Sequence, residues 1–125
     1  MIQTMFTVAL GGAIGSTLRY LVNVASGRLL GIGFPFGTMF VNIVGSFVMG
    51  VLAVLLAGRS GSWHVPFLMT GILGGFTTFS AFSLDAMVLY DGGRAGLAAF
   101  YVIASVVVGL MALVAGMALA KGYFA

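Results

Sequence analysis

The sequence predicts an all-α integral membrane protein with four transmembrane helices. Hydrophobic residues make up 62% of the 125 residues and charged residues only 6%, and the mean hydropathy is +1.24. Soluble domains carry about 25% charged residues, so most of this chain must face lipid rather than water. Its apolar segments are also long enough to cross a bilayer core, which requires about 20 residues per helix.

The apolar segments fill the chain and form a single four-span membrane domain over residues 1–125. The spans are expected at about residues 4–25, 37–57, 66–90 and 95–120. Turn-forming residues separate them, and the first gap is expected to begin at Ser26-Gly27-Arg28. Because residues 1–10 contain no basic residue, we expect the first segment to be a retained span rather than a signal peptide. An even number of spans places both termini on one side of the membrane.

The basic residues are almost balanced between the two sides of the membrane, and their distribution sets the orientation of a membrane protein. Arg59 and Lys121 lie on the side of the amino terminus, whereas Arg28 and Arg94 lie on the other side, with Arg19 near the end of its helix. A chain with such weak orientation signals is expected to insert both ways. This balance favours an antiparallel, dual-topology homodimer.

Small residues recur at four-residue spacing, which allows helix backbones to approach closely in lipid. The pairs are Gly11 and Gly15, Gly12 and Ser16, Ser46 and Gly50, and Ser105 and Gly109. We expect tight helix packing at these positions, either within one subunit or between two subunits.

The third segment contains an unusual stretch in its middle. Gly74 and Gly75 precede Thr77 and Thr78, and this combination makes a poor helix, so a break is expected at residues 74–78. Irregular backbone at membrane depth is tolerated only where it is buried or lines a polar cavity, and its free carbonyl and N–H groups attract ions. The break is a candidate ion site; the alternative is an intact helix that uses its glycines for packing.

Two aromatic residues follow the break. Phe79 and Phe82 are three residues apart and share a helix face, and Ser80 lies between them. An aromatic ring has a positive edge, so two rings placed edge-on to a path would attract an anion weakly. Considered alone, such a pair is more often an ordinary packing or lipid-facing pair.

Neutral polar side chains in the other spans change that balance. Asn42 lies in the second span with Thr38 one turn before it, and Tyr101 and Ser105 lie one turn apart in the fourth span. Each of them singly is explained by a hydrogen bond between helices. As a set they are neutral donors, which can replace water around an anion without trapping it as a full charge would. The set therefore favours a path for an anion.

The composition excludes several other classes of function. The first, second and fourth spans contain no Asp or Glu, whereas proton-coupled transporters need an intramembrane carboxylate. The five Lys and Arg are scattered, whereas a nucleic-acid surface needs them clustered, so no nucleic-acid partner is expected. The sequence contains no cysteine, no cluster of metal ligands and no nucleophile–base set, so we do not expect an enzyme. His64 beside Trp63 is interpreted as interfacial.

Three motifs are typical of one known family. They are Gly11-Gly12 with Gly15 and Leu18-Arg19-Tyr20 in the first span, Gly37-Thr38 with Val41-Asn42 in the second, and Gly74-Gly75-Phe76-Thr77-Thr78-Phe79-Ser80-Ala81-Phe82-Ser83 in the third. With these motifs the chain resembles the small Fluc (CrcB) fluoride channels over nearly its whole length. The third motif is long and unusual for a membrane span, which makes the resemblance specific.

The resemblance implies a passive, fluoride-selective channel that exports fluoride from the cytoplasm across the inner (plasma) membrane. It also implies antiparallel homodimers in the lipid bilayer, with two pores and a structural sodium ion at the dimer interface. By this likeness the pore residues would be Thr38, Asn42, Phe79, Ser80, Phe82, Tyr101 and Ser105. Arg19 would lie at the aqueous vestibule, and the backbone carbonyls of Gly74 and Thr77 from both subunits would hold the sodium.

The chain departs from the family's pattern at three positions. Ala81 stands where the family often has Thr, Asp85 stands where Glu is common, and Gly109 stands where some relatives carry Ser. Two alternatives to the channel make different predictions. A small proton-coupled multidrug-type transporter predicts a titrating carboxylate in the first span, which this chain lacks. A purely structural membrane subunit would need its intramembrane polar groups only for packing.

Overall fold

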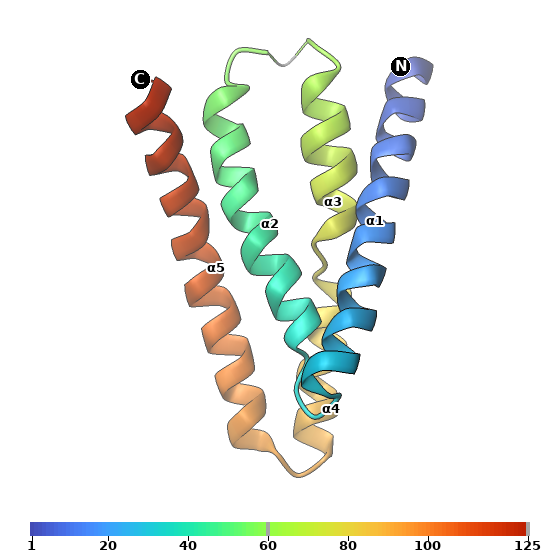
Figure 1. Ribbon diagram of the computed structural model, residues 1–125, viewed down its shortest axis with the longest axis vertical. Helices are drawn as coiled ribbons and strands as arrows, with labels where there is room; N and C mark the ends of the chain where they lie inside the picture. The colour runs from blue at the N-terminus through green and yellow to red at the C-terminus, as the bar shows by residue number, and fades with distance from the viewer. Residues whose placement is uncertain (60, 125) are drawn as a thin grey trace.

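The computed structural model describes residues 1–59 and 61–124, and within these residues it contains helices and no strand. The elements are α1 (Ile2–Leu30), α2 (Phe36–Leu55), η1 (Val65–Leu73), α3 (Gly74–Phe76), α4 (Ser80–Asp91) and α5 (Ala95–Phe124). Four helical stretches are long and apolar enough to cross a membrane, with η1, α3 and α4 together forming the third. The prediction of an all-α, four-span membrane protein is confirmed. Both termini lie at the same end of the bundle (Figure 1).

The first helix is longer than expected. The prediction that a loop begins at Ser26-Gly27-Arg28 is wrong, because α1 continues to Leu30. The Ser26 hydroxyl donates to the Asn23 carbonyl oxygen at 3.3 Å, and the start of α2 lies directly on this turn, since a Cβ on Gly37 would overlap the Asn23 and Ser26 side chains. Packing against α2 therefore stabilises a turn that the local sequence disfavours.

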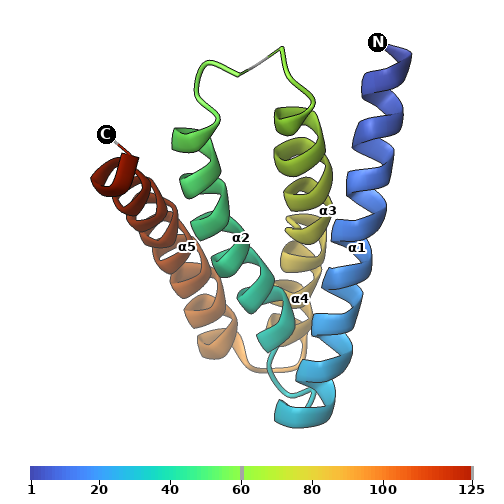
Figure 2. The ribbon, with the colours of Figure 1, turned by 45° about the horizontal axis from the view of Figure 1, so that its top comes forward.

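The third span is interrupted, as predicted, but the interruption comes later than expected. Gly74 has helical backbone angles (φ −60°, ψ −36°), whereas Thr77 is extended (φ −86°, ψ 161°), and the irregular residues are 77–79. The expectation that the break starts at Gly74 is wrong, because the paired glycines belong to the end of the first half of the span. Figure 2 shows the two halves of this span, η1 with α3 above and α4 below.

Gly75, at this end of the span, serves packing against α1. A Cβ on Gly75 would lie 2.7 Å from the Gly12 carbonyl oxygen, and a Cβ on Gly15 would overlap the Ile72 carbonyl. The obstacle is backbone in both cases, so no side chain could move aside. The same arrangement recurs between α2 and α5, where Gly50 faces the Leu113 carbonyl and Gly116 faces the Phe47 carbonyl. Gly11, Gly15 and Gly50, three of the spaced small residues, therefore lie at close helix contacts within one subunit.

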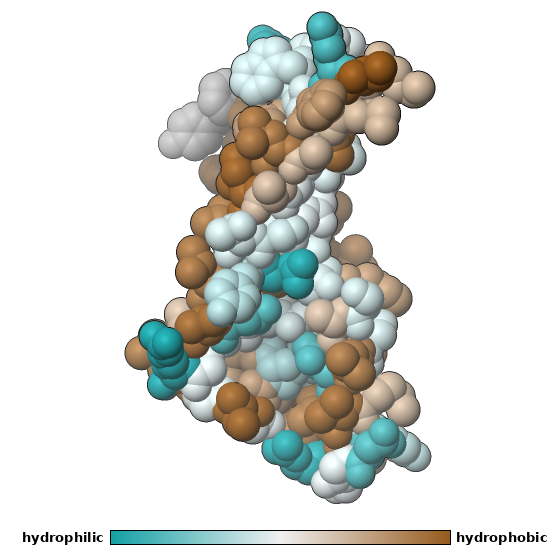
Figure 3. Space-filling model, turned by 90° about the vertical axis from the view of Figure 1, so that its right-hand side faces the viewer, coloured by the Kyte–Doolittle hydropathy of each residue, from teal (hydrophilic) through white to brown (hydrophobic). Residues whose placement is uncertain are grey.

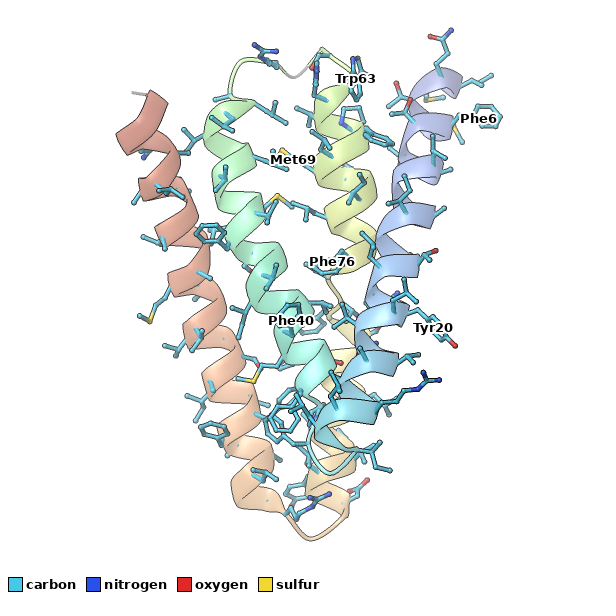
Figure 4. All side chains as sticks on the ribbon, in the orientation of Figure 1. Phe6, Tyr20, Phe40, Trp63, Met69 and Phe76 are labelled. Carbon is cyan, nitrogen blue, oxygen red and sulfur yellow. The ribbon has the colours of Figure 1, made fainter. Side chains whose placement is uncertain are left out.

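The outer surface of the chain is largely apolar. Phe6 is 72% exposed and Tyr20 is 66% exposed, and both project away from the other helices (Figure 4). Figure 3 shows brown and pale surface over much of one face, with teal groups toward the ends and part-way along it. The small core lies around Leu89, Ala98 and Tyr101. Exposure of this kind is favourable only in lipid.

We predict that Gly15→Ala destabilises the protein by about 1–3 kcal/mol, because the added methyl group would overlap backbone that cannot repack. Thermal unfolding in detergent, followed by size-exclusion chromatography, measures the effect. Gly96→Ala is the matched control, because a Cβ there meets nothing within 4 Å and alanine favours a helix. An equal loss of stability in both variants would contradict the packing role of Gly15.

Candidate functional site

Asn42 on α2 forms hydrogen bonds with the backbone of Thr78, where the third span leaves the helical conformation. Its Nδ2 donates to the Thr78 carbonyl oxygen at 2.9 Å, and the Thr78 amide donates to Asn42 Oδ1 at 2.8 Å. In a continuous helix the Thr78 amide would donate to the Gly74 carbonyl. Unpaired backbone groups are costly in lipid, and this one side chain satisfies both the amide and the carbonyl of Thr78.

Arg19 and Thr77 stabilise the end of the helix that precedes the break. Arg19 Nε on α1 donates to the Gly75 carbonyl oxygen at 3.0 Å, and a cation is favourable at the carboxyl end of a helix. The Thr77 hydroxyl and amide both donate to the Leu73 carbonyl oxygen, at 2.9 Å and 3.0 Å. Arg19 therefore also anchors the break to α1, a contact that the sequence did not predict.

The two threonines of the break have different tasks. The Thr77 side chain closes the helix before it, whereas Thr78 Oγ1 accepts the Ala81 amide at 3.2 Å and caps the first turn of α4, as a threonine does at a helix start. Ser83 adds a bond from its hydroxyl to the Phe79 carbonyl oxygen at 3.0 Å. Both ends of the interruption are thus stabilised by side chains within the span itself.

A pocket of about 330 Å³ lies beside the break, between α2, α4 and α5. It brings together four residues predicted for the pore: Asn42, Phe79, Phe82 and Ser105. The two phenylalanine rings lie 5.9 Å apart between centroids. Gly45, Ser46, Met49, Thr77, Thr78, Val106 and Leu113 complete the lining. The pocket therefore combines aromatic rings with neutral polar groups, and no charged residue lines it.

Ser105 has an unusual environment within this pocket. The residue is 8% exposed, and within the described residues its hydroxyl oxygen is buried without a hydrogen-bond partner. Leaving a buried hydroxyl unsatisfied costs about 1–3 kcal/mol, and such a group calls for an explanation such as a bound ion or water. Its position on the wall of the pocket indicates a site for a small polar occupant.

Tyr101 and Thr38, also predicted for the pore, lie next to this pocket but outside its lining. Tyr101 is fully buried, its ring lies 5.2 Å from that of Phe82, and its hydroxyl donates to Asp85 Oδ2 at 3.2 Å. Thr38 and Asp85 line a second pocket of about 310 Å³ toward the loop between α1 and α2. The role of Asp85, which the sequence left open, includes accepting this hydrogen bond.

Two residues at the end of the break and the start of α4 face outward from the chain. Phe79 is 78% exposed, and Ser80 is exposed and lies outside both pockets. Gly74 is exposed as well. The structure of one chain thus brings Asn42, Phe82 and Ser105 together inside the bundle and leaves Ser80 at its edge.

Comparison with known proteins identifies the family. The family model described as CrcB-like protein, Camphor Resistance (CrcB), matches residues 6–117. The chain belongs to this family. A protein named fluoride-specific ion channel FluC, from Cereibacter sphaeroides, is 62% identical to this CrcB chain over 125 residues, which are 100% of both chains.

Two further relatives carry the same name. The one from Paracoccus denitrificans is 54% identical over 125 residues, 100% of both chains. The one from Agrobacterium fabrum is 57% identical over 119 residues, which are 94% of this CrcB chain and 95% of the relative. The resemblance inferred from the sequence motifs is confirmed. The chain belongs to a family of channels and is not an enzyme.

We predict that Asn42→Ala raises the hydrogen-exchange rate of the Thr78 amide by at least about tenfold, since the variant leaves that buried amide without its acceptor. Amide exchange followed by NMR in detergent micelles measures it. The Thr77 amide is an internal control, because its acceptor is the Leu73 carbonyl of the same span. Unchanged exchange at Thr78 would show that Asn42 does not hold the break.

Proposed function

We propose that this CrcB-family chain is a passive, fluoride-selective channel that exports fluoride from the cytoplasm across the inner membrane. The observation that carries the proposal is the pocket beside the break, where Asn42, Ser105, Phe79 and Phe82 meet without a charged residue. The identity of the ion comes from the relatives, which are named fluoride-specific ion channels.

The chemistry of the pocket suits a small anion. Ser105 has an unpartnered hydroxyl. An asparagine amide has two N–H donors, and one of those on Asn42 is used by the Thr78 carbonyl, so the second can face the pocket. The edges of Phe79 and Phe82 add weak positive potential. These groups replace part of the hydration of an anion, yet none holds it so strongly that it could not leave.

The direction of transport follows from the membrane potential. Moving one elementary charge across 100 mV changes its free energy by about 2.3 kcal/mol. A potential that is negative inside therefore drives an anion out of the cell without any coupled proton or sodium. The neutral lining of the pocket agrees with such passive movement.

The functional unit that we propose is an antiparallel, dual-topology homodimer with two pores. One chain leaves Phe79 78% exposed beside a pocket that this residue lines, so a second copy is needed to close the path. The near-equal distribution of basic residues at the two ends of the spans supports insertion in both orientations. Each pore would then be lined by residues of both chains.

A structural sodium ion at the dimer interface is part of this proposal. The Thr78 amide donates to Asn42 rather than to Gly74, so the Gly74 carbonyl lacks the donor of a continuous helix. Thr77 is extended, which turns its carbonyl out of the helix ladder. Free carbonyl oxygens of broken membrane helices are suitable ligands for sodium. The two carbonyls of each chain would supply the ligands, and the ion would neutralise the ends of both breaks.

We predict that Phe82→Ile lowers fluoride efflux at least about tenfold in liposomes, because the variant removes the aromatic edge from the path. A fluoride electrode measures the efflux of purified protein, and a chloride electrode measures selectivity in parallel. Phe6→Ile is the matched control, since Phe6 projects away from the bundle (Figure 4) and its loss should leave the flux unchanged. Comparable chloride flux in the unaltered protein would overturn the proposed selectivity.

We also predict that a cysteine at Gly61 and a cysteine at Gly96 are each labelled from the outside in about half of the molecules in intact cells, as dual topology requires. The chain contains no native cysteine, and at both positions a Cβ meets nothing within 4 Å. A membrane-impermeant maleimide measures the labelled fraction. Complete labelling at one position and none at the other would show a single orientation.

A further inference from the structure

Two helices present matching rows of residues toward each other. α2 and α5 run in the same direction through the bundle (Figure 1). The rows, each with a residue at every fourth position, are Thr38, Asn42 and Ser46 on α2, and Tyr101, Ser105 and Gly109 on α5. Residues four apart in a helix share a face and lie about 6 Å apart along the axis. Each residue of one row is therefore expected to lie beside one residue of the other: Thr38 beside Tyr101, Asn42 beside Ser105, and Ser46 beside Gly109.

The lining of the pocket and the glycine contacts show which residues of the two rows lie at the same height along the helices. Asn42 and Ser105 line the same pocket, and Ser46 lines it too. A Cβ placed on Gly109 would lie 3.8 Å from Ser46 Oγ, with no other such neighbour within 4 Å. Ser46 thus faces the bare backbone of α5 at Gly109, one helical turn beyond the level of Asn42.

We propose that the Ser46 hydroxyl is a further anion contact in the conduction path, which it shares with the hydroxyl of Ser105. This inference rests on the proposed function, and it names a residue whose place in the path the family motifs do not mark. An anion moving between the two helices would accept an O–H from each serine in turn. Such contacts give the buried Ser105 hydroxyl the partner that it lacks within the chain.

The absence of a side chain at Gly109 fits this role. The nearest neighbour of a Cβ at that position is Ser46 Oγ, at an ordinary contact distance, so the space is open enough for one small group. A small ion that has left the level of Asn42 meets the Ser46 hydroxyl after about 6 Å, the rise of one helical turn and a fraction. Successive weak sites of this kind favour conduction over trapping.

A role for Ser46 in packing alone makes a different prediction. The close approach of α2 and α5 is set where Gly50 and Gly116 face carbonyls of the other helix, and alanine at position 46 would keep a small side chain beside that crossing. If Ser46 only fills space, its oxygen is dispensable. If Ser46 contacts the anion, removal of its oxygen lowers the fluoride flux, and a hydroxyl supplied to the same space from α5 restores it.

The test compares variants of the full-length protein that differ by one oxygen atom. Ser46→Ala is expected to lower fluoride efflux from liposomes at least about fivefold, as the loss of a hydrogen bond to a charged group implies. Adding Gly109→Ser to Ser46→Ala returns a hydroxyl to the same space from α5 and should restore at least about half of the original rate. Adding Gly109→Ala instead supplies a methyl group without the oxygen and should restore none of the lost rate.

Two controls separate the possible failures. Thr17→Ala removes a hydroxyl that is bonded to the Ala13 carbonyl of its own helix and should leave the rate unchanged. If the unaltered protein moves no fluoride, the proposed function itself is wrong. If it does, and Ser46→Ala conducts like it, only the role of Ser46 is wrong. Equal rates in the two double variants, with matching elution in size-exclusion chromatography, would also overturn the inference, because the oxygen would then have no effect.

Discussion

The two hydrogen bonds between Asn42 and the backbone of Thr78 allow the third span to leave the helical conformation inside a membrane. Lipid offers no water to satisfy an interrupted helix, so the interruption can persist only if another part of the chain supplies both a donor and an acceptor. A primary amide is the side chain that offers both in one plane. Asn42 and Thr78 both line the pocket of the candidate site, so this contact fixes part of its wall.

The surrounding backbone is held by contacts that leave little freedom. Arg19 bonds to the Gly75 carbonyl, Thr78 caps α4, and glycines bring η1 and α3 against α1. Several polar groups of the break thereby have partners, whereas the hydroxyl of Ser105 has none within the described residues. A stretch of backbone held in this way makes a rigid wall, and the unpartnered hydroxyl of Ser105 lies on the helix that faces it.

Much of this architecture was predictable from the sequence, and the reason is the solvent. Few charges and long apolar segments define spans without reference to tertiary structure, so the existence of four spans could be predicted. The last turn of α1 could not, because it packs against Gly37, a contact that no local pattern reveals. The break itself was predicted from Gly74, Gly75 and the threonines, but its position was not. Consecutive glycines occur both where a helix is interrupted and where two helices touch, so the sequence alone does not distinguish the two cases.

The site was predictable where residues share a helix face and unpredictable where they meet across helices. The spacing of Phe79 and Phe82, or of Tyr101 and Ser105, can be counted along the chain. The bond from Tyr101 to Asp85 joins two helices, so it has no signature in either segment alone. Ser46 was missed for another reason: it is four residues after Asn42 and could have been counted, but it was assigned to helix packing alone.

The backbone-to-backbone contact of α1 with η1 and α3 has a consequence for motion. Side chains at a helix interface can change rotamers and so absorb small displacements, but Gly15 and Gly75 lie against carbonyl groups and have no rotamers to change. Packed interfaces of this kind shift between discrete arrangements rather than deforming gradually. The first half of the third span must therefore travel with α1 as one rigid body. Any flexing that accompanies the passage of an ion is left to α4, on the far side of the break, and to the phenylalanines that it carries.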